Sequence, residues 1–242
     1  MTTLAKIIAA TLISLSLFSC NFDMNLNPGV KGNGDVKIKN RTMNQPFTTI
    51  KATEGLDVYL TQSDSESIRV EADENLQDII VTEVIDGVLK IHTKQNIGRC
   101  TSKKVMVSFR DISSIISTSG SDVYSTNTIT SENLNLESTS GSDMKLDVNT
   151  TTLNCKSTSG SDLKLSGKTI KLIAEATSGS DIKAENLIAE SSEVRATSGA
   201  GITVNTTKEL TANATSGADI KYLGNPEVVN KNNSSSGSIQ RE

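Results

Sequence analysis

Apolar and small residues occupy every second position through long stretches of the second half of the chain. Starting from Leu134, Leu153 and Ile170, the alternating positions carry Leu, Ile, Val, Met, Cys, Ala or Ser, and the positions between them are mostly polar. Successive side chains of a β-strand point to opposite faces, so a period of two is typical of strands with one buried side. The pattern predicts a strand-rich stretch after each of the three residues, which would themselves point inward.

Shorter strands are predicted in the first half. Runs rich in Val, Ile, Leu and Tyr, separated by turn signals such as Glu54-Gly55, cover residues 36–38, 56–60, 68–70, 79–85, 88–91 and 105–109. The same part holds the larger rings Phe47, Tyr59 and Phe109. We expect residues 35–112 to form irregular coils and the cap that protects the end of a solenoid.

The sequence Thr-Ser-Gly-Ser-Asp recurs along the second half. Copies begin at Thr118, Thr139, Thr158 and Thr177, variants begin at Thr197 and Thr215, and a degenerate copy covers 235–238. The copies follow one another every 18 to 21 residues. A repeat of this length with strand-like content predicts a solenoid in which each repeat forms one coil. The fold class is therefore expected to be all-β, with residues 113–242 forming parallel β-helix coils of about 20 residues.

Stacked coils would bring equivalent positions of the repeat into columns. Period two predicts three inward columns, namely Ser138, Ser157, Ala176, Ala196 and Ala214; Ser140, Ser159, Ser178, Ser198 and Ser216; and Ser142, Ser161, Ser180, Ala200 and Ala218. Side chains this small suit a narrow core. The glycine of the motif also fits a turn with unusual dihedral angles, with serine capping the backbone. The sequence leaves open whether the motif is a straight strand or a tight corner.

Outward positions would form rows of like charge. The candidate binding face consists of Asp122, Asp143, Asp162, Asp181 and Asp219, followed two residues later by Lys145, Lys164, Lys183 and Lys221. Coils lie about 4.8 Å apart, and unit charges at that spacing repel by about 0.8 kcal/mol in water, so the lysine row is expected to offset the aspartate row. Three interpretations stay open: a solvated face, calcium between successive aspartates, or direct contact with a ligand. Gly201 and Ile239 stand where aspartate is expected, which interrupts the row near its end.

Several short motifs occur in a fixed order. Phe-Thr-Thr-Ile at 47–50, Gly-Leu-Asp-Val-Tyr-Leu at 55–60 and Gly-Val-Leu-Lys-Ile at 87–91 lead into the repeated Gly-Ser-Asp units. Over about residues 47–230 this arrangement resembles the auto-transporter adhesin family called the head GIN domain. The resemblance implies a right-handed parallel β-helix with a role in adhesion at the cell envelope. It also implies a shape similar to pectin-lyase enzymes without their catalytic groups.

The start of the chain is typical of an export signal. Lys6 precedes an apolar run over 7–18, which is too short for a bilayer span of about 20 residues. Leu17-Phe18-Ser19-Cys20 resembles the bacterial lipobox, whose cysteine is acylated and becomes the mature N-terminus. We expect a lipoprotein signal peptide over 1–19, lipidation of Cys20 and a flexible tether over 20–34. The alternative is an ordinary secretory signal in which Cys20 has no role.

Composition narrows the classes of function. The 242 residues include 32 Ser and 28 Thr, no Trp and 3% aromatics, with a net charge of -4. An acidic chain without a basic patch is a poor nucleic-acid binder, and so few rings predict no stacking platform for bases or sugars.

Candidate chemistry is sparse. His92 is the single histidine and alternates with Leu89 and Ile91 as an exposed strand residue would, so no catalytic residue is assigned. Cys155 falls on an inward position, and a disulfide to Cys100 stays open. The sequence predicts no cofactor and no resident metal site.

These observations favour a non-catalytic lipoprotein of the cell envelope, held at the outer membrane and exposed at the cell surface. Its partners are expected to be the membrane, glycans or proteins of a host or of the envelope, and further copies of the chain that join at coil ends. Two alternative functions stay open: a carbohydrate-active β-helix enzyme, either a lyase or a hydrolase, and a structural spacer stabilised by calcium.

Overall fold

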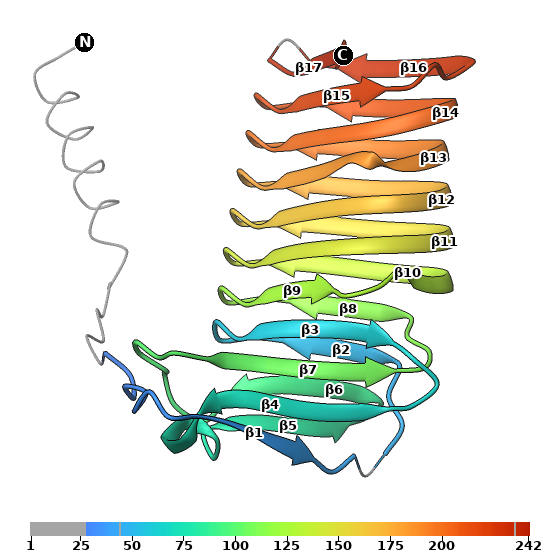
Figure 1. Ribbon diagram of the computed structural model, residues 1–242. Coiled ribbons are helices and arrows are strands. Elements are labelled where there is room, and N and C mark those ends of the chain that lie inside the picture. Colours follow the sequence, from blue (N-terminus) through green and yellow to red (C-terminus); the bar gives the residue numbers. More distant parts are fainter. Residues whose placement is uncertain (1–27, 44, 235) are drawn as a thin grey trace, which may run out of the picture.

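The chain winds into a β-solenoid in which each coil lies on the one before it (Figure 1). The computed structural model describes residues 28–43, 45–234 and 236–242. These residues form 17 strands in one hydrogen-bonded sheet, wound into about seven turns of about 19 residues. The prediction of an all-β parallel solenoid is therefore confirmed. The predicted signal peptide over 1–19 and Cys20 lie outside the described residues.

The regular coils come from the second half of the chain. Their strands are β8 (Ser114–Ser117), β9 (Asp122–Ser125), β10 (Ile129–Thr139), β11 (Asp143–Thr158), β12 (Asp162–Thr177), β13 (Asp181–Thr197), β14 (Gly201–Ala214), β15 (Asp219–Leu223), β16 (Val228–Asn233) and β17 (Ser238–Arg241). Neighbouring coils pair in parallel and place like residues side by side: Asp143 pairs with Asp162, which pairs with Asp181. The repeat thus sets the register of the stack.

Each of the six coils with a complete Thr-Ser-Gly motif, from Thr118 to Thr215, turns sharply at that motif, along the left edge of Figure 1. Within one copy Ser159 has φ 57° and Gly160 has φ 69°. Two consecutive residues in the left-handed region form a turn of the type I′ kind, which reverses the chain in the smallest space. The Gly160 N–H donates to the carbonyl oxygen of Ser178 in the next coil at 3.2 Å. The ladder between coils therefore continues through the corner.

Buried serines close the inside of the corner. The Ser161 hydroxyl accepts the Thr158 N–H at 3.1 Å and lies 2.8 Å from the carbonyl oxygen of Ser138 in the preceding coil. It also lies 2.9 Å from the Ser157 hydroxyl. A buried hydroxyl with such partners avoids the cost of an unsatisfied polar group. The small polar side chains are therefore part of the hydrogen-bonded corner.

The predicted columns are right for two positions of the motif and wrong for the third. The Ser138 and Ser142 columns are buried as predicted. The Ser140 column is exposed, with φ 58° at Ser140 itself, because the left-handed pair turns the chain and ends the alternation there. Of the two readings left open by the sequence, the tight corner is correct.

A second bend lies on the other side of the coil and corrects another prediction. In β12, Thr169 and Leu172 are buried, whereas Ile170 between them is 51% exposed. The step from one buried position to the next is three residues here instead of two, because the strand bends and its alternation starts again. The inward placement of Ile170 was wrong for this reason. Gly167 lies just before this bend. Only glycine fits there, because a Cβ would lie 2.1 Å from the carbonyl oxygen of Val148.

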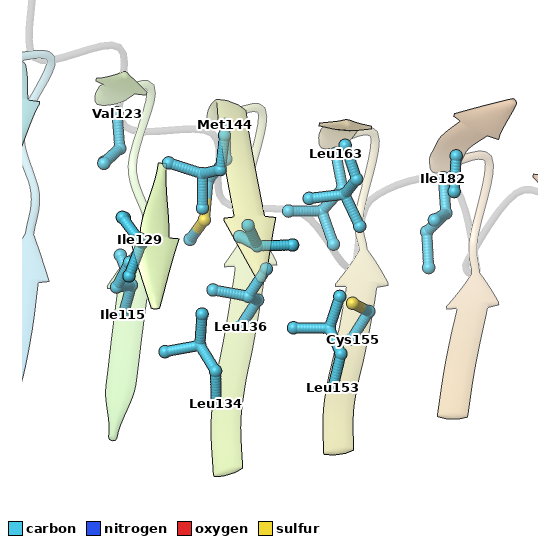
Figure 2. Packing of buried hydrophobic residues seen from close by; sticks show 14 of the residues in the cluster. Ile115, Val123, Ile129, Leu134, Leu136, Met144, Leu153, Cys155, Leu163 and Ile182 are labelled. Carbon is cyan, nitrogen blue, oxygen red and sulfur yellow. The ribbon is translucent and has the colours of Figure 1, made fainter. Parts of the chain in front are cut away.

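The core is a narrow column of aliphatic side chains along the axis. Figure 2 shows Val123, Met144, Leu163 and Ile182, which occupy equivalent positions of successive coils. All four are at most 1% exposed. Stacking the same kind of side chain at each level gives every coil two apolar neighbours, which no single coil could supply for itself.

The first half of the chain adds a coil out of sequence order. Its elements are β1 (Val36–Arg41), β2 (Thr49–Ala52), β3 (Asp57–Gln62), β4 (Ser67–Asp73), a short 3₁₀ helix (Glu74–Leu76), β5 (Ile80–Ile85), β6 (Val88–Thr93) and β7 (Lys103–Phe109). β2 pairs in parallel with β6 on one side and with β8 on the other, and β3 does the same with β7 and β9. Residues 49–62 are therefore inserted between two later segments.

Antiparallel strands close this end of the solenoid. β4 pairs with β7, β1 pairs with β4 and β5 pairs with β6, all antiparallel. The side chain of Gln77 is buried behind them and donates to the carbonyl oxygens of Lys37 and Val70 at 2.8 Å and 3.2 Å. The parallel coil at this end, which contains β6 and β7, is thus covered by antiparallel strands.

The described part of the predicted tether is held in place. Val30 forms a bridge with Ile97, and the Gly34 N–H donates to a carboxylate oxygen of Asp73 at 2.8 Å. The expectation of a flexible tether over 20–34 is wrong for 28–34, because these polar and glycine residues supply backbone donors to the cap.

The carboxylate of Asp73 joins three segments of the cap by hydrogen bonds. Its fully buried carboxylate accepts N–H groups from Gly34, Thr101 and Ser102, the last two at 3.0 Å and 2.9 Å. Burial alone would raise the pKa of Asp73, but these backbone hydrogen bonds outweigh it and leave the pKa below its ordinary value. The ionised form is therefore the one that stabilises the cap.

The cap should lose stability in acid through Asp73. A carboxyl whose pKa is lowered by folding contributes stability above its unfolded pKa and loses it as the pH falls through the folded value. We expect Asp73→Asn to lower the urea midpoint of the cap at pH 7, and the deficit to shrink below the ordinary value of 3.8. Urea titrations of both proteins at several pH values measure this. A deficit that is the same at every pH would contradict the assignment.

The two kinds of bend predict different costs for adding a methyl group. Gly160 has φ 69° and open space where a Cβ would lie, so Gly160→Ala should cost about 1 kcal/mol from backbone strain alone. Gly167→Ala adds a clash with the Val148 carbonyl to its own strain at φ 105°, and should cost about 3 kcal/mol. Chemical denaturation of the two variants checks the order. Equal losses would show that the second bend is not packed as described.

Candidate binding surface

An aspartate row runs along one face of the solenoid. Parallel pairing places Asp57, Asp122, Asp143, Asp162 and Asp181 side by side on successive coils, and Asp219 follows after Gly201. The structure thus brings together all five aspartates of the predicted face. It also adds a sixth, Asp57, which comes from the inserted coil of the first half.

Asp57 was missed because its corner lacks the repeated motif. Thr-Glu-Gly-Leu-Asp at 53–57 takes the place of Thr-Ser-Gly-Ser-Asp at 118–122. Glu54 and Gly55 have φ 63° and 70°, close to the values at the serine corners. The shared Thr-x-Gly-x-Asp spacing, followed in both places by Val-Tyr, was the signal that could have revealed this copy.

The last position of the row also differs from the prediction. Ser238, rather than Ile239, pairs with Asp219. Ile239 pairs with the buried Ile220 and faces inward. The degenerate last copy lacks one residue of the motif, so counting from its glycine puts the outward position one residue too far.

The predicted lysine row is also in register. Lys145, Lys164 and Lys183 are successive partners, Thr203 interrupts the row, and Lys221 follows. Lys183 Nζ lies 3.0 Å from Asp162 Oδ2 and 3.4 Å from Asp181 Oδ2, so it bridges two coils. These hydrogen bonds, with that to Asp162 first, raise the pKa of Lys183.

Direct charge compensation is limited to part of the face. Lys221 pairs with Glu242 at 2.7 Å rather than with an aspartate of the row. Lys145 and Lys164 are exposed and form no ion pair with any described residue. The expected offset of the aspartate row is therefore made by contact at Lys183 and elsewhere acts only through solvent.

Burial and the charges of its row neighbours both act on Asp122, and Lys103 and Tyr124 oppose them only in part. Partial burial, followed by the nearby charges of Asp143 and Asp57, raises the pKa of Asp122. Tyr124, two residues on, takes the place of a lysine, and burial together with Asp122 raises the pKa of its hydroxyl. The charge of Asp122 is thus both partly buried and repelled by its neighbours in the row.

The other long face of the solenoid avoids like neighbours. Glu137, Lys156, Glu175 and Arg195 are successive partners there, so the sign of the charge alternates from coil to coil. Opposite charges at neighbouring positions stabilise a sheet, whereas like charges destabilise it. Accumulation of one charge is therefore a property of the aspartate face and not of the stack as such.

Two tyrosines from distant parts of the chain meet on the same face. The rings of Tyr59 and Tyr124 have their centroids 5.2 Å apart and an angle of 26° between their planes. The low aromatic content had predicted no stacking platform. The sequence did not reveal this pair, which arises because parallel pairing of β3 with β9 places two of the few rings together.

The histidine and the two described cysteines that the sequence singled out are bonded or buried. His92 Nε2 lies 3.1 Å from Glu83 Oε1 on the neighbouring strand. Cys155 is buried and Cys100 half-buried, both are free thiols, and burial raises the pKa of each. Among residues 28–43, 45–234 and 236–242, three or more His, Cys, Asp or Glu side chains never gather as a metal site would require.

Within the described part of the chain there is no helix long and apolar enough to span a membrane. Open depressions lie on its surface. The fold and the face together define a β-solenoid with a repetitive outer surface.

The chain belongs to the family described as "Putative auto-transporter adhesin, head GIN domain", which matches residues 46–226. The resemblance seen in the sequence is therefore confirmed. Membership in this family is typical of proteins of the cell surface or envelope. A search among curated proteins finds no match.

Solved structures share the fold. A putative adhesin from Bacteroides fragilis superposes with a TM-score of 0.81 at 21% identity, over 88% of this chain and 100% of that one. A putative adhesin from Parabacteroides distasonis gives 0.72 at 21% identity over 88% and 99%. A third structure, from the same species and described as a putative lipid binding protein, gives 0.68 at 21% identity over 88% and 99%. At this identity the likeness shows the fold alone.

Relieving the repulsion at Asp122 should stabilise the protein. Because its pKa is raised in the folded state, ionising this group lowers stability as the pH rises from 3.8 toward the raised value. We expect Asp122→Asn to add up to about 1 kcal/mol at pH 7, since water screens half-exposed charges, and to add nothing in acid. Denaturation at pH 7 and pH 3 measures both.

Asp219→Asn is the matched control, because the row neighbours of Asp219 are Gly201 and Ser238. This variant should gain no stability at pH 7. An equal gain at both positions would mean that repulsion along the row is not the cause.

Proposed function

We propose that this protein is a non-catalytic adhesive module of the cell envelope that binds through its aspartate and lysine rows. One observation carries the proposal: successive coils are in register, so each outward residue type forms a continuous row. Chemically equal groups then repeat about every 4.8 Å along a flat surface. Such a surface suits many weak, equivalent contacts with a glycan or protein.

Multivalent contact explains how a face without a deep pocket can still attach firmly. When several linked groups bind together, the overall affinity exceeds that of each contact by factors of about 100 or more. The adhesin names of the family and of the similar structures support this class of function.

The arrangement of carboxylates supports a role without catalysis. A glycosidase needs two carboxyl groups in different environments at one site. Here Asp143 and Asp162 hold equivalent positions on successive coils of an open row, and of the two only Asp162 is contacted by Lys183. His92, the one histidine, is engaged with Glu83 on the hairpin of β5 and β6.

The proposed lipid anchor fits the direction of the solenoid. Val30, among the first described residues, is hydrogen-bonded to the capped end. Acylation of Cys20 would therefore hold the cap near the membrane and leave the repeated coils farther out. Labelling of intact cells with an antibody against the repeated coils would report whether this face lies outside.

The triple variant Asp143→Ala, Asp162→Ala and Asp181→Ala tests the binding face. Beads coated with purified protein should lose attachment to glycan or matrix-protein surfaces by about 10-fold or more, since several contacts disappear at once. Attachment under flow, measured over a panel of such surfaces, reads this out. Unchanged attachment would overturn the assignment of the face.

A matched control removes the same number of carboxylates from the other long face. Glu137, Glu175 and Glu193 are exposed there, and replacing all three by alanine changes the net charge equally. This control should attach as the unmodified protein does. If both triple variants lose attachment alike, net charge and not the aspartate face is responsible.

A further inference from the structure

An open depression of about 340 Å³ lies on the aspartate face at its capped end. Its walls come from β3, β4, β7 and the residue that follows β9, and consist of Tyr59, Thr61, Arg69, Glu71, Lys104, Met106, Ser108 and Thr126. These residues come together only because the inserted coil lies beside β7. The depression is separate from Asp143, Asp162 and Asp181.

The floor of the depression is apolar. Arg69, Met106 and Tyr59 are successive partners across β4, β7 and β3. Tyr124 pairs with Tyr59 on the opposite side from Met106 and stacks on its ring. One side of the Tyr59 ring is thus supported, and the other borders the depression. An aromatic ring held in this way is a platform for the apolar face of a sugar or for a second ring.

Hydroxyl groups line the side of the depression beyond the tyrosine. The hydroxyls of Thr61 and Thr126 are 2.7 Å apart, and Ser108 is the strand partner of Thr61. Each hydroxyl can both donate and accept, so this wall can match the hydroxyls of a saccharide without a fixed pattern.

The charges at the rim leave one cation unpaired. Lys104 Nζ lies 3.3 Å from Glu71 Oε1, which also accepts from the Ser102 hydroxyl at 3.0 Å. The side chain of Arg69 is exposed, and its guanidinium has no hydrogen bond or ion pair within the described residues. A free guanidinium beside an aromatic floor is suited to a planar carboxylate, which it can bind through two parallel hydrogen bonds.

From this geometry we propose that the depression binds a sugar that carries a carboxylate. The apolar face of the sugar packs on Tyr59 and Met106, the carboxylate pairs with Arg69, and the ring hydroxyls bond to Thr61 and Ser108. A polyanion such as a nucleic acid or a heavily sulfated chain is disfavoured, because Asp57 and Asp122 follow directly along the same face. The site goes beyond the proposed function, and each can hold without the other.

Binding of sialyllactose and of galacturonate, which each carry a single carboxylate, to the purified full chain tests the proposal, with lactose as the neutral control. Ligand-observed NMR and calorimetry should show binding of at least one acidic sugar, with a Kd on the order of 1 mM as for a single open site. Lactose should bind at least 10-fold more weakly. The proposal is overturned if neither acidic sugar binds, or if lactose binds equally well.

Arg69→Gln tests the proposed carboxylate contact without disturbing the core, because Arg69 is exposed. It should weaken binding of the acidic sugar by about 10-fold, whereas Arg195→Gln, an exposed arginine of the other long face, should leave it unchanged. Tyr59→Leu should weaken all sugar binding through loss of the ring face. Equal affinity of Arg69→Gln and the unmodified protein would contradict the proposed pairing of the sugar carboxylate with Arg69.

The triple alanine variant at Asp143, Asp162 and Asp181 distinguishes this site from the adhesive face. It should bind the acidic sugar as the unmodified protein does. If it does not, the depression is not an independent site and this inference is wrong, whatever the outcome for attachment.

Discussion

The hydrogen bond from the glycine of one corner to the serine carbonyl of the next coil holds the stack together where the chain turns most sharply. It requires two successive residues in the left-handed region, as at Ser159 and Gly160. The inner position of the repeated corners holds a buried serine or alanine, whereas the corner of the inserted coil holds Leu56 there. Because every corner meets the same demand, the same short sequence recurs. The hydroxyl of Ser161 then satisfies polar groups that the turn would otherwise bury without partners.

Stacking in register also limits which residue types suit the outward rows. Each outward residue acquires an equal neighbour on both sides, which favours uncharged rows and penalises charged ones. The face of Glu137, Lys156 and Glu175 meets this constraint by alternating sign. The aspartate face does not, and only Lys183 relieves it by direct contact within the described residues. We place the contact surface on the aspartate row, because this row lowers stability and has no role in packing. The carboxylate-binding depression lies where the row meets Tyr59 and Tyr124.

Local sequence was enough to predict the regular coils and their rows, because the repeat spacing and the register are the same quantity. Prediction failed wherever the chain left that spacing. Ser140 and Ile170 were assigned inward since alternation was extended through bends, and Ile239 was misplaced since the last copy is shorter. Asp57, the tyrosine pair and the Asp73 cap depend on pairing between distant segments, including 49–62 beside 114–125. A period in the sequence cannot reveal a coil inserted out of order.

Distances between spin labels along the aspartate row test the central claim most directly. Labels at positions 57 and 162 are three coils apart, and labels at 57 and 219 are six coils apart. In a background in which Cys20 and Cys100 are serine, the backbone separations should be about 14 Å and about 29 Å, at about 4.8 Å for each coil. Distances that follow coil number support the in-register stack with its inserted coil. Distances that do not double between the two pairs would contradict it.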